Sequence, residues 1–186
     1  MIKKQDLSVA FAALERLKEG NAIYLNSEIN GGDVSPSKRA DTYKNGQHPY
    51  AVVVSCADSR VIPEAIFSCG IGDLFVIRVA GNVVGNVELG SVEYAVEHLG
   101  VRLVLVLGHT GCGAVNAALH QNRGLVKHVT DEIKRAIGAE TDEVKASVLN
   151  VRQSVAKIEQ SLLKTENVYV CGALYHTESG TVDFLS

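Results

Sequence analysis

The sequence predicts an α/β protein with a mostly parallel central β-sheet, made of four strands plus an edge strand, flanked by helices and preceded by an N-terminal helical arm. Two observations lead to this fold class. Short apolar runs rich in Val, Leu and Ile recur along the chain, and such continuous runs are typical of strands buried on both faces. Helical patterns separate these runs, and alternating strands and helices are typical of a parallel sheet covered by helices.

The length and composition suit one globular domain. The chain has 186 residues, of which 46% are hydrophobic and 21% charged. This length supports one sizeable core and is too short for two. We therefore expect a single domain over residues 1–186, with the helical arm over 1–35 and the α/β core over 47–186.

The sequence predicts an N-terminal helix and five strands. The helix is expected over about Leu7–Lys18, ended by Gly20-Asn21, and a polar connector around Asn30–Asp33 follows it. The expected strands are Tyr50–Ser55, Leu74–Val79, Arg102–Leu107, Val168–Cys171 and, at the edge after a turn, Thr181–Leu185.

Two helices between these strands show clear apolar stripes. Apolar residues recur on one helical face from Leu89 to Leu99, before the third strand, and from Val144 to Leu162, before the fourth. The second stripe also has a spacing close to that of a coiled-coil helix, but we interpret it as a face packed on the core. The region His120–Glu140 gives only weak helical signals.

Several classes of protein are disfavoured by the charge and cysteine content. The net charge of -3 and the lack of a Lys/Arg block argue against nucleic acid or a membrane surface as a partner. No run approaches the roughly 20 apolar residues of a membrane span. Charged residues such as Glu15 interrupt the N-terminal apolar stretch, so it does not form the core of a signal peptide. Four cysteines are too few for a disulfide scaffold, so we expect a reducing, cytoplasmic location.

Three side chains that suit a metal follow two of the apolar runs. Cys56 comes directly after the first strand, and His109 and Cys112 come after the third. The carboxyl ends of parallel strands meet at one edge of a sheet, so these residues can lie together. Thiolates and an imidazole suit Zn²⁺, and three protein ligands leave a fourth position open. The pattern predicts a catalytic zinc site.

The surroundings of Cys112 strengthen this prediction. Gly108, Gly111 and Gly113 allow the backbone to come close to a metal, and Cys112 opens an expected helix whose positive end favours a thiolate. A lone cysteine or histidine is more often a buried structural residue. Two half-sites accompanied by an Asp and an Arg make the metal the better interpretation.

The residues Cys56-Ala57-Asp58-Ser59-Arg60 and His109-Thr110-Gly111-Cys112 together resemble the paired signature of the β-class carbonic anhydrases. The segments Gly72–Asn82 and Gly90–Val96 resemble the parts of that family that lie between. This resemblance implies a carbonic anhydrase, a zinc lyase that hydrates CO₂ reversibly to bicarbonate and a proton by attack of a zinc-bound hydroxide on CO₂.

Position by position, the resemblance implies roles for the site residues. Cys56, His109 and Cys112 would hold one Zn²⁺ per chain. Asp58 and Arg60 would be the catalytic pair beside the metal, with Asp58 accepting a hydrogen bond from the nucleophile and Arg60 holding it. If that pair breaks, Asp58 can become the fourth zinc ligand and block the site.

The resemblance also implies substrate-binding residues and an oligomer. Gln47, Phe75, Tyr94 and Gly113 would bind CO₂ or bicarbonate, and the family assembles as a homodimer or homotetramer with active sites at the subunit interface. The alternative interpretations are core aromatics for Phe75 and Tyr94 and a surface amide for Gln47. Two other functions stay open: hydrolysis of carbonyl sulfide or carbon disulfide on the same fold, and a structural zinc site without catalysis.

Overall fold

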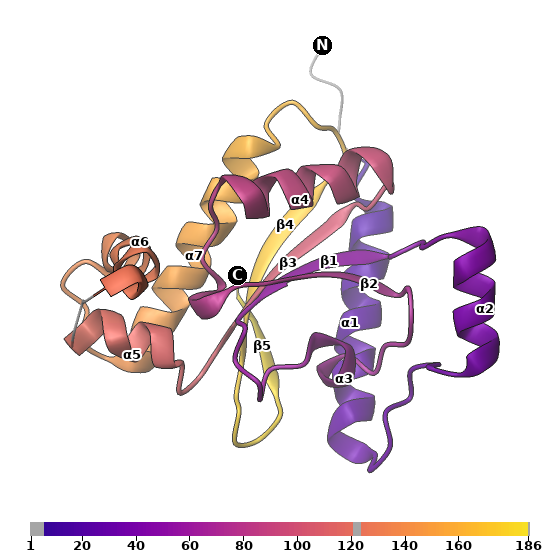
Figure 1. Cartoon of the computed structure of the whole chain (residues 1–186), viewed down its shortest axis with the longest axis horizontal. Helices are drawn as coiled ribbons and strands as arrows, with labels where there is room; N and C mark the ends of the chain where they lie inside the picture. Colours follow the sequence, from indigo (N-terminus) through magenta and orange to yellow (C-terminus); the bar gives the residue numbers. More distant parts are fainter. Residues whose placement is uncertain (1–5, 121–123, 186) are drawn as a thin grey trace.

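The computed structural model describes residues 6–120 and 124–185 and contains one five-stranded sheet (Figure 1). The strands are β1 (Ala51–Ser55), β2 (Leu74–Arg78), β3 (Leu103–His109), β4 (Tyr169–Tyr175) and β5 (Val182–Leu185). The helices are α1 (Ser8–Asn26), α2 (Pro36–Asn45), α3 (Pro63–Ile66), α4 (Asn86–His98), α5 (Gly113–His120), α6 (Lys127–Ile137) and α7 (Glu143–Ser161), with short 3₁₀ turns η1 (Ala80–Asn82) and η2 (Gly124–Val126).

The predicted fold class is confirmed. The strand order is β2-β1-β3-β4-β5, with the first four strands parallel and β5 antiparallel at the edge. The chain leaves β1 to form β2 on one side and then crosses back to form β3 on the other. This reversal makes the carboxyl ends of β1 and β3 a topological switch point, the usual place for a ligand in such a sheet.

Helices cover both faces of the sheet (Figure 1). Alternate residues of β1 point to opposite faces, as the period of a strand requires: Val53 packs in a layer with Leu17 of α1, whereas Val54 packs in a layer with Val92 of α4 and Val151 of α7. A third, smaller apolar cluster lies beside α5 and α6. It includes two of the predicted metal ligands.

The predicted end of the first helix at Gly20-Asn21 is wrong, because α1 continues to Asn26. A Cβ on Gly20 would lie 2.0 Å from the carbonyl oxygen of Phe67, so this glycine lets α1 approach the chain after α3. The side chain of Asn21 is buried, and its amide nitrogen donates to the carbonyls of Ile66 and Gly180. Both residues serve tertiary packing rather than helix termination.

Replacing Gly20 with alanine is therefore expected to destabilise the protein, although alanine favours helix by about 1 kcal/mol. The new methyl group cannot fit against the Phe67 carbonyl, and overpacking of this kind costs about 1–3 kcal/mol. Urea denaturation measures the free energy of unfolding. The exposed neighbour Glu19→Ala is the control and should change it by less than about 0.5 kcal/mol; equal stabilities for the two variants would contradict the close approach.

Other boundaries also differ from the expectations. The strand β4 continues four residues beyond Cys171, and His109 is the last residue of β3 rather than part of the loop after it. The helix α2 was not predicted because it buries no residue. Its signal was Ser35 followed by a proline, since Ser35 Oγ accepts a hydrogen bond from the Lys38 amide at the N-cap.

The structure describes most of the expected N-terminal arm. Residues 1–5 of the expected arm lie outside the described part of the chain. The remainder of the arm holds α1, which packs on the sheet.

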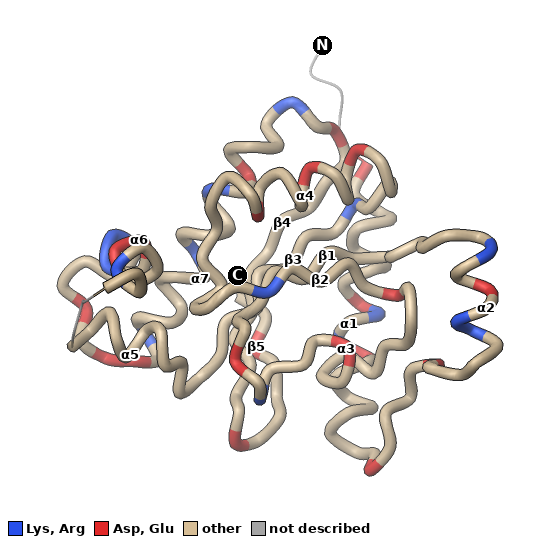
Figure 2. The backbone as a smooth tube through the Cα atoms, in the orientation of Figure 1, with Lys and Arg blue, Asp and Glu red and all other residues tan. Residues whose placement is uncertain are grey.

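Figure 2 shows acidic and basic residues interspersed along the backbone. Within residues 6–120 and 124–185, no helix combines the length and hydrophobicity that a membrane crossing requires.

Candidate metal centre

Three donor side chains meet at the carboxyl ends of β1 and β3. Cys56 follows the last residue of β1, His109 ends β3, and Cys112 directly precedes α5. Their ligand atoms all lie within 4.8 Å of one another, and all three residues are buried. The parallel pairing of β1 with β3 brings these distant parts of the sequence to one edge.

The imidazole of His109 has an orientation that suits a metal ligand. Its Nδ1 lies 3.0 Å from the carbonyl oxygen of Thr110, where a ring N–H donates. This leaves the lone pair on Nε2, and Nε2 is one of three buried side-chain nitrogen or oxygen atoms in the described chain without a hydrogen-bond partner. An unpartnered buried nitrogen is costly, and a metal supplies the missing partner.

The sulfur of Cys56 is placed to be a thiolate. The backbone amides of Gly81 and Asp58 donate to Sγ at 3.2 and 3.4 Å. A hydrogen bond from the Cys112 thiol, together with these amides, lowers the pKa of Cys56, although burial opposes the charge. The neighbouring Cys56 thiolate and burial raise the pKa of Cys112. Binding a metal to both sulfurs would therefore displace a proton from Cys112.

Asp58 lies beside the three donors and is held by Arg60. The guanidinium donates from Nε to Oδ1 at 3.0 Å and from Nη2 to Oδ2 at 2.8 Å. This charge-assisted pair holds the pKa of Asp58 well below its usual range. Oδ2 of Asp58 is 3.9 Å from Nε2 of His109, so the carboxylate adjoins the place where a metal would bind.

Two arginines tie the halves of the centre together. Arg60 also donates to the carbonyl of Gly111 at 2.9 Å, next to Cys112. Arg78, at the end of β2, donates to the carbonyls of Cys56 and Asp58 at 3.2 and 2.7 Å. No local pattern assigns this role to Arg78, because the contact depends on the pairing of β2 with β1.

The structure brings only one of the four expected substrate-binding residues to the metal donors. Gly113 is exposed at the start of α5, next to Cys112. Gln47 is exposed before β1, at the opposite end of that strand from Cys56.

The two aromatic residues lie on another surface. Phe75 of β2 pairs with the second residue of β1, roughly 13 Å along the strand from Cys56 at 3.3 Å per residue. Tyr94 of α4 is 47% exposed, and its ring centroid is 6.1 Å from that of Phe75. Within one chain these aromatics form a pair away from the metal donors.

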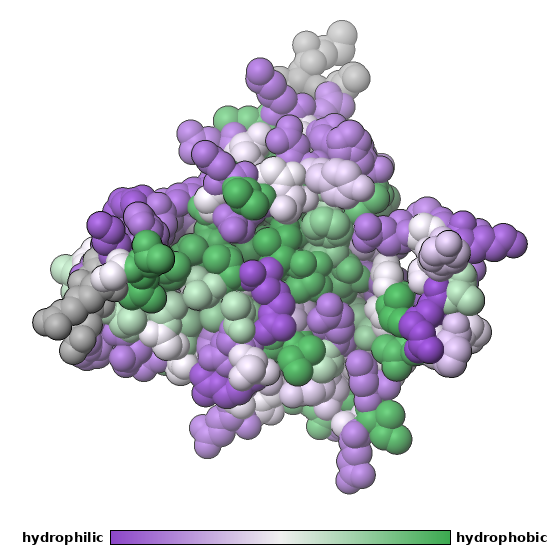
Figure 3. Space-filling model, in the orientation of Figure 1, coloured by the Kyte–Doolittle hydropathy of each residue, from purple (hydrophilic) through white to green (hydrophobic). Residues whose placement is uncertain are grey.

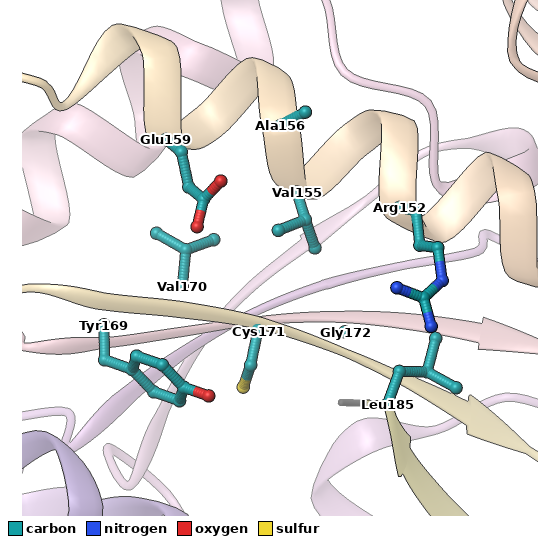
Figure 4. A pocket seen from close by; sticks show the side chains of 9 residues that line it. All are labelled: Arg152, Val155, Ala156, Glu159, Tyr169, Val170, Cys171, Gly172 and Leu185. Atoms are coloured by element: carbon teal, nitrogen blue, oxygen red, sulfur yellow. The ribbon is translucent and has the colours of Figure 1, made fainter.

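A cavity of about 300 Å³ lies elsewhere, between α7 and the strands β4 and β5 (Figure 4). Figure 4 shows Val170 directed toward α7, while Tyr169 and Cys171 point to the other face of β4. None of the three clustered donors lines this cavity. The metal centre is thus the place in the described chain where chemistry-bearing side chains converge.

Comparison with known proteins gives a consistent result. The family model described as carbonic anhydrase matches residues 51–182. A carbonic anhydrase of Mycolicibacterium smegmatis is 36% identical over an alignment that covers 94% of this chain and 93% of that protein. Carbonic anhydrase 2 of Mycobacterium tuberculosis is 50% identical over 58% of this chain and 52% of its own length. The crystal structure of the β-carbonic anhydrase CafA of Aspergillus fumigatus is similar with a TM-score of 0.72 and 26% identity, covering 95% of this chain and 90% of that one.

Proposed function

This chain belongs to the β-class of the carbonic anhydrase family, and from this premise we propose that Cys56, His109 and Cys112 hold Zn²⁺ in a site that hydrates CO₂ reversibly to bicarbonate and a proton. The observation that carries the proposal is the buried, unpartnered Nε2 of His109 within 4.8 Å of both cysteine sulfurs. A soft donor set of this composition suits zinc and leaves room for a further ligand.

The chain's own residues prepare the reaction. A Zn²⁺ ion held by Cys56, His109 and Cys112 would supply Lewis acidity, which lowers the pKa of a water molecule toward neutrality and makes it a nucleophile for carbon dioxide. The two sulfurs balance the charge of the metal, and the Thr110 carbonyl fixes the ring of His109. Asp58 stays ionised beside Arg60, so it can accept a hydrogen bond from the attacking group and orient it toward the substrate.

Arg60 also keeps Asp58 out of the position of a metal ligand. Both carboxylate oxygens of Asp58 already accept hydrogen bonds from the Arg60 side chain, and Arg60 is anchored in turn on the Gly111 carbonyl. In this arrangement the fourth position of the metal centre stays available to the reactants.

Gln47, Phe75 and Tyr94 act, in our proposal, in the site of a second copy of the chain within a homodimer or homotetramer. All three lie too far from the metal donors of their own chain. Phe75 lies on β2, the strand at the free edge of the sheet, and the ring of Tyr94 lies beside it. This edge is incompletely covered: all of β2 is partly or fully exposed, and Val87 on α4 is 78% exposed. Figure 3 shows apolar residues gathered over the middle of this view, and extended apolar surfaces mark interfaces.

Replacing Tyr94 with arginine is therefore expected to produce monomers and to lower the rate of CO₂ hydration together. The charge would have to be buried without a partner at an apolar interface, which is costly. Sedimentation velocity measures the mass, and stopped-flow measures the activity. Leu163→Arg, at a site 79% exposed beyond the end of α7, is the matched control and should preserve both. An active monomer of the Tyr94 variant would refute the shared site.

A reducing cytoplasm is the compartment that we propose. All four cysteines carry free thiols, and Cys56 and Cys112 must remain reduced to bind a metal. Oxidation of this pair to a disulfide would remove two of the three donors.

The test of the function is stopped-flow CO₂ hydration between pH 6.5 and 9, with the zinc content measured on the same sample. Fast turnover at about one zinc per chain is the expected result. A full complement of zinc without turnover would refute it, and the same protein would then be assayed with carbonyl sulfide and carbon disulfide.

A further inference from the structure

Three polar side chains of α7 are buried, and two of them, Asn150 and Ser154, form hydrogen bonds outside the helix. Asn150 is 2% exposed and Ser154 is 3% exposed, beside the fully buried Val151 and Ile158. Polar groups at such positions are costly unless they form hydrogen bonds. Neither residue is one of the three clustered metal donors, and the side chains of both form hydrogen bonds outside their own helix.

Both partners lie in one turn, η1. The Asn150 side-chain amide donates to the carbonyl of Gly81 at 2.7 Å, and Ser154 Oγ donates to the carbonyl of Asn82 at 3.0 Å. Another buried serine of the same helix, Ser147, instead donates to the carbonyl of Glu143 within α7. The helix thus holds η1 through two adjacent peptide carbonyls.

The turn η1 has a conformation that needs such support. Gly81 has φ +66° and Asn82 has φ +45°, in the left-handed region that is unfavourable for residues other than glycine. A Cβ on Gly81 would lie 2.8 Å from Cδ1 of Ile133 and 3.0 Å from Cβ of Ala114. Close packing and the two hydrogen bonds from α7 together fix this backbone.

The opposite side of the same turn contacts the metal centre. Asn150 donates to the carbonyl of Gly81, and the backbone N–H of the same glycine donates to the sulfur of Cys56 at 3.2 Å. We propose that Asn150 and Ser154 are positioning residues that hold this amide against the Cys56 sulfur and so set the metal affinity and the electronic character of that ligand. This inference rests on the proposed zinc site.

The physical effect has two parts. A fixed amide keeps the sulfur in its ligating position before the metal arrives, and partners that orient ligands are typically worth about 10–100-fold in metal affinity. The same hydrogen bond withdraws charge from the thiolate. Its loss raises the energy of the sulfur lone pair, so the sulfur-to-metal charge-transfer absorption should move to lower energy.

The test replaces Asn150 with leucine, which has a similar size and no hydrogen-bonding group. Zinc affinity is measured by competition with a chelator, and the sulfur-to-cobalt absorption is recorded on protein loaded with Co²⁺. We expect Asn150→Leu to bind zinc about 10–100-fold more weakly and to shift the absorption to lower energy. Ser154→Ala, a milder change, should move both in the same direction.

Ser147→Ala is the matched control, because it removes a buried hydroxyl of α7 that donates its hydrogen bond within the helix, to the carbonyl of Glu143. It should leave the zinc affinity and the cobalt spectrum as in the unmodified protein. Unchanged values in both Asn150→Leu and Ser154→Ala, or an equal change in Ser147→Ala, would overturn the inference. An unmodified protein that binds neither zinc nor cobalt would overturn the proposed site itself as well.

Discussion

Replacing Cys56 with alanine is expected to remove zinc from the protein and to reduce CO₂ hydration to the uncatalysed rate. Cys56 supplies one of the three donors that cluster in the described part of the chain, and two backbone amides stabilise its sulfur as a thiolate. The remaining thiol and imidazole cannot form a complete zinc site. The zinc content, measured by metal analysis, should fall from about one per chain to near none. Stopped-flow measures the loss of turnover.

The control for this variant is Cys171→Ala, which removes a buried cysteine of β4 that is not part of the donor cluster. It should retain zinc and activity, with a loss of at most about 1–2 kcal/mol in the free energy of unfolding. Circular dichroism establishes that both variants are folded. Full zinc and full activity in Cys56→Ala would refute the assignment of this ligand.

Replacing Asp58 with asparagine is expected to separate zinc binding from turnover. Asparagine has nearly the same shape, so the three metal donors should keep their positions and the zinc content should not change. The negative charge that pairs with Arg60 is lost, and with it the anionic acceptor that orients the attacking group. Removing one such preorganised contact commonly costs about 10²–10³-fold in kcat.

Asp183→Asn provides the comparison for Asp58→Asn, because Asp183 is an exposed carboxylate on β5 that pairs with His176. Stopped-flow kinetics and metal analysis should give values near those of the unmodified protein for this variant. If Asp58→Asn retained full turnover, Asp58 would have no part in the mechanism. If it lost its zinc, its role would be to support the metal rather than to orient the nucleophile.

The sheet and the metal donors were accessible from sequence because their signals are local. Apolar runs identified the four parallel strands, since such strands carry apolar side chains at consecutive positions, and the turn before Thr181–Leu185 indicated the edge strand β5. The residue types at the ends of β1 and β3 indicated zinc, and those strands are neighbours in the sheet. The resemblance to a known family added the roles of Asp58 and Arg60, which local patterns could not supply.

The wrong end of α1 and the missed helix α2 each have a physical cause. Gly20 and Asn21 have the composition of a helix end, yet the contacts of α1 with the segment around Ile66 and Phe67 use the same two residues for close packing. The helix α2 buries nothing, so it lacks the apolar stripe by which helices are recognised. For α1 the deciding contacts join distant parts of the chain, and for α2 there are no buried residues to form a pattern.

The sequence by itself determined the fold class, the kind of metal and the three side chains suited to bind it, because these depend on residue type and on position relative to strand ends. Only the tertiary structure decided how the ligands are held. The unpartnered nitrogen of His109, the Gly81 amide on Cys56 and the support of that turn by Asn150 arise where separate elements pack together. Hydrogen bonds between elements far apart along the chain leave no periodic pattern in the sequence, and they are set by the geometry of packing.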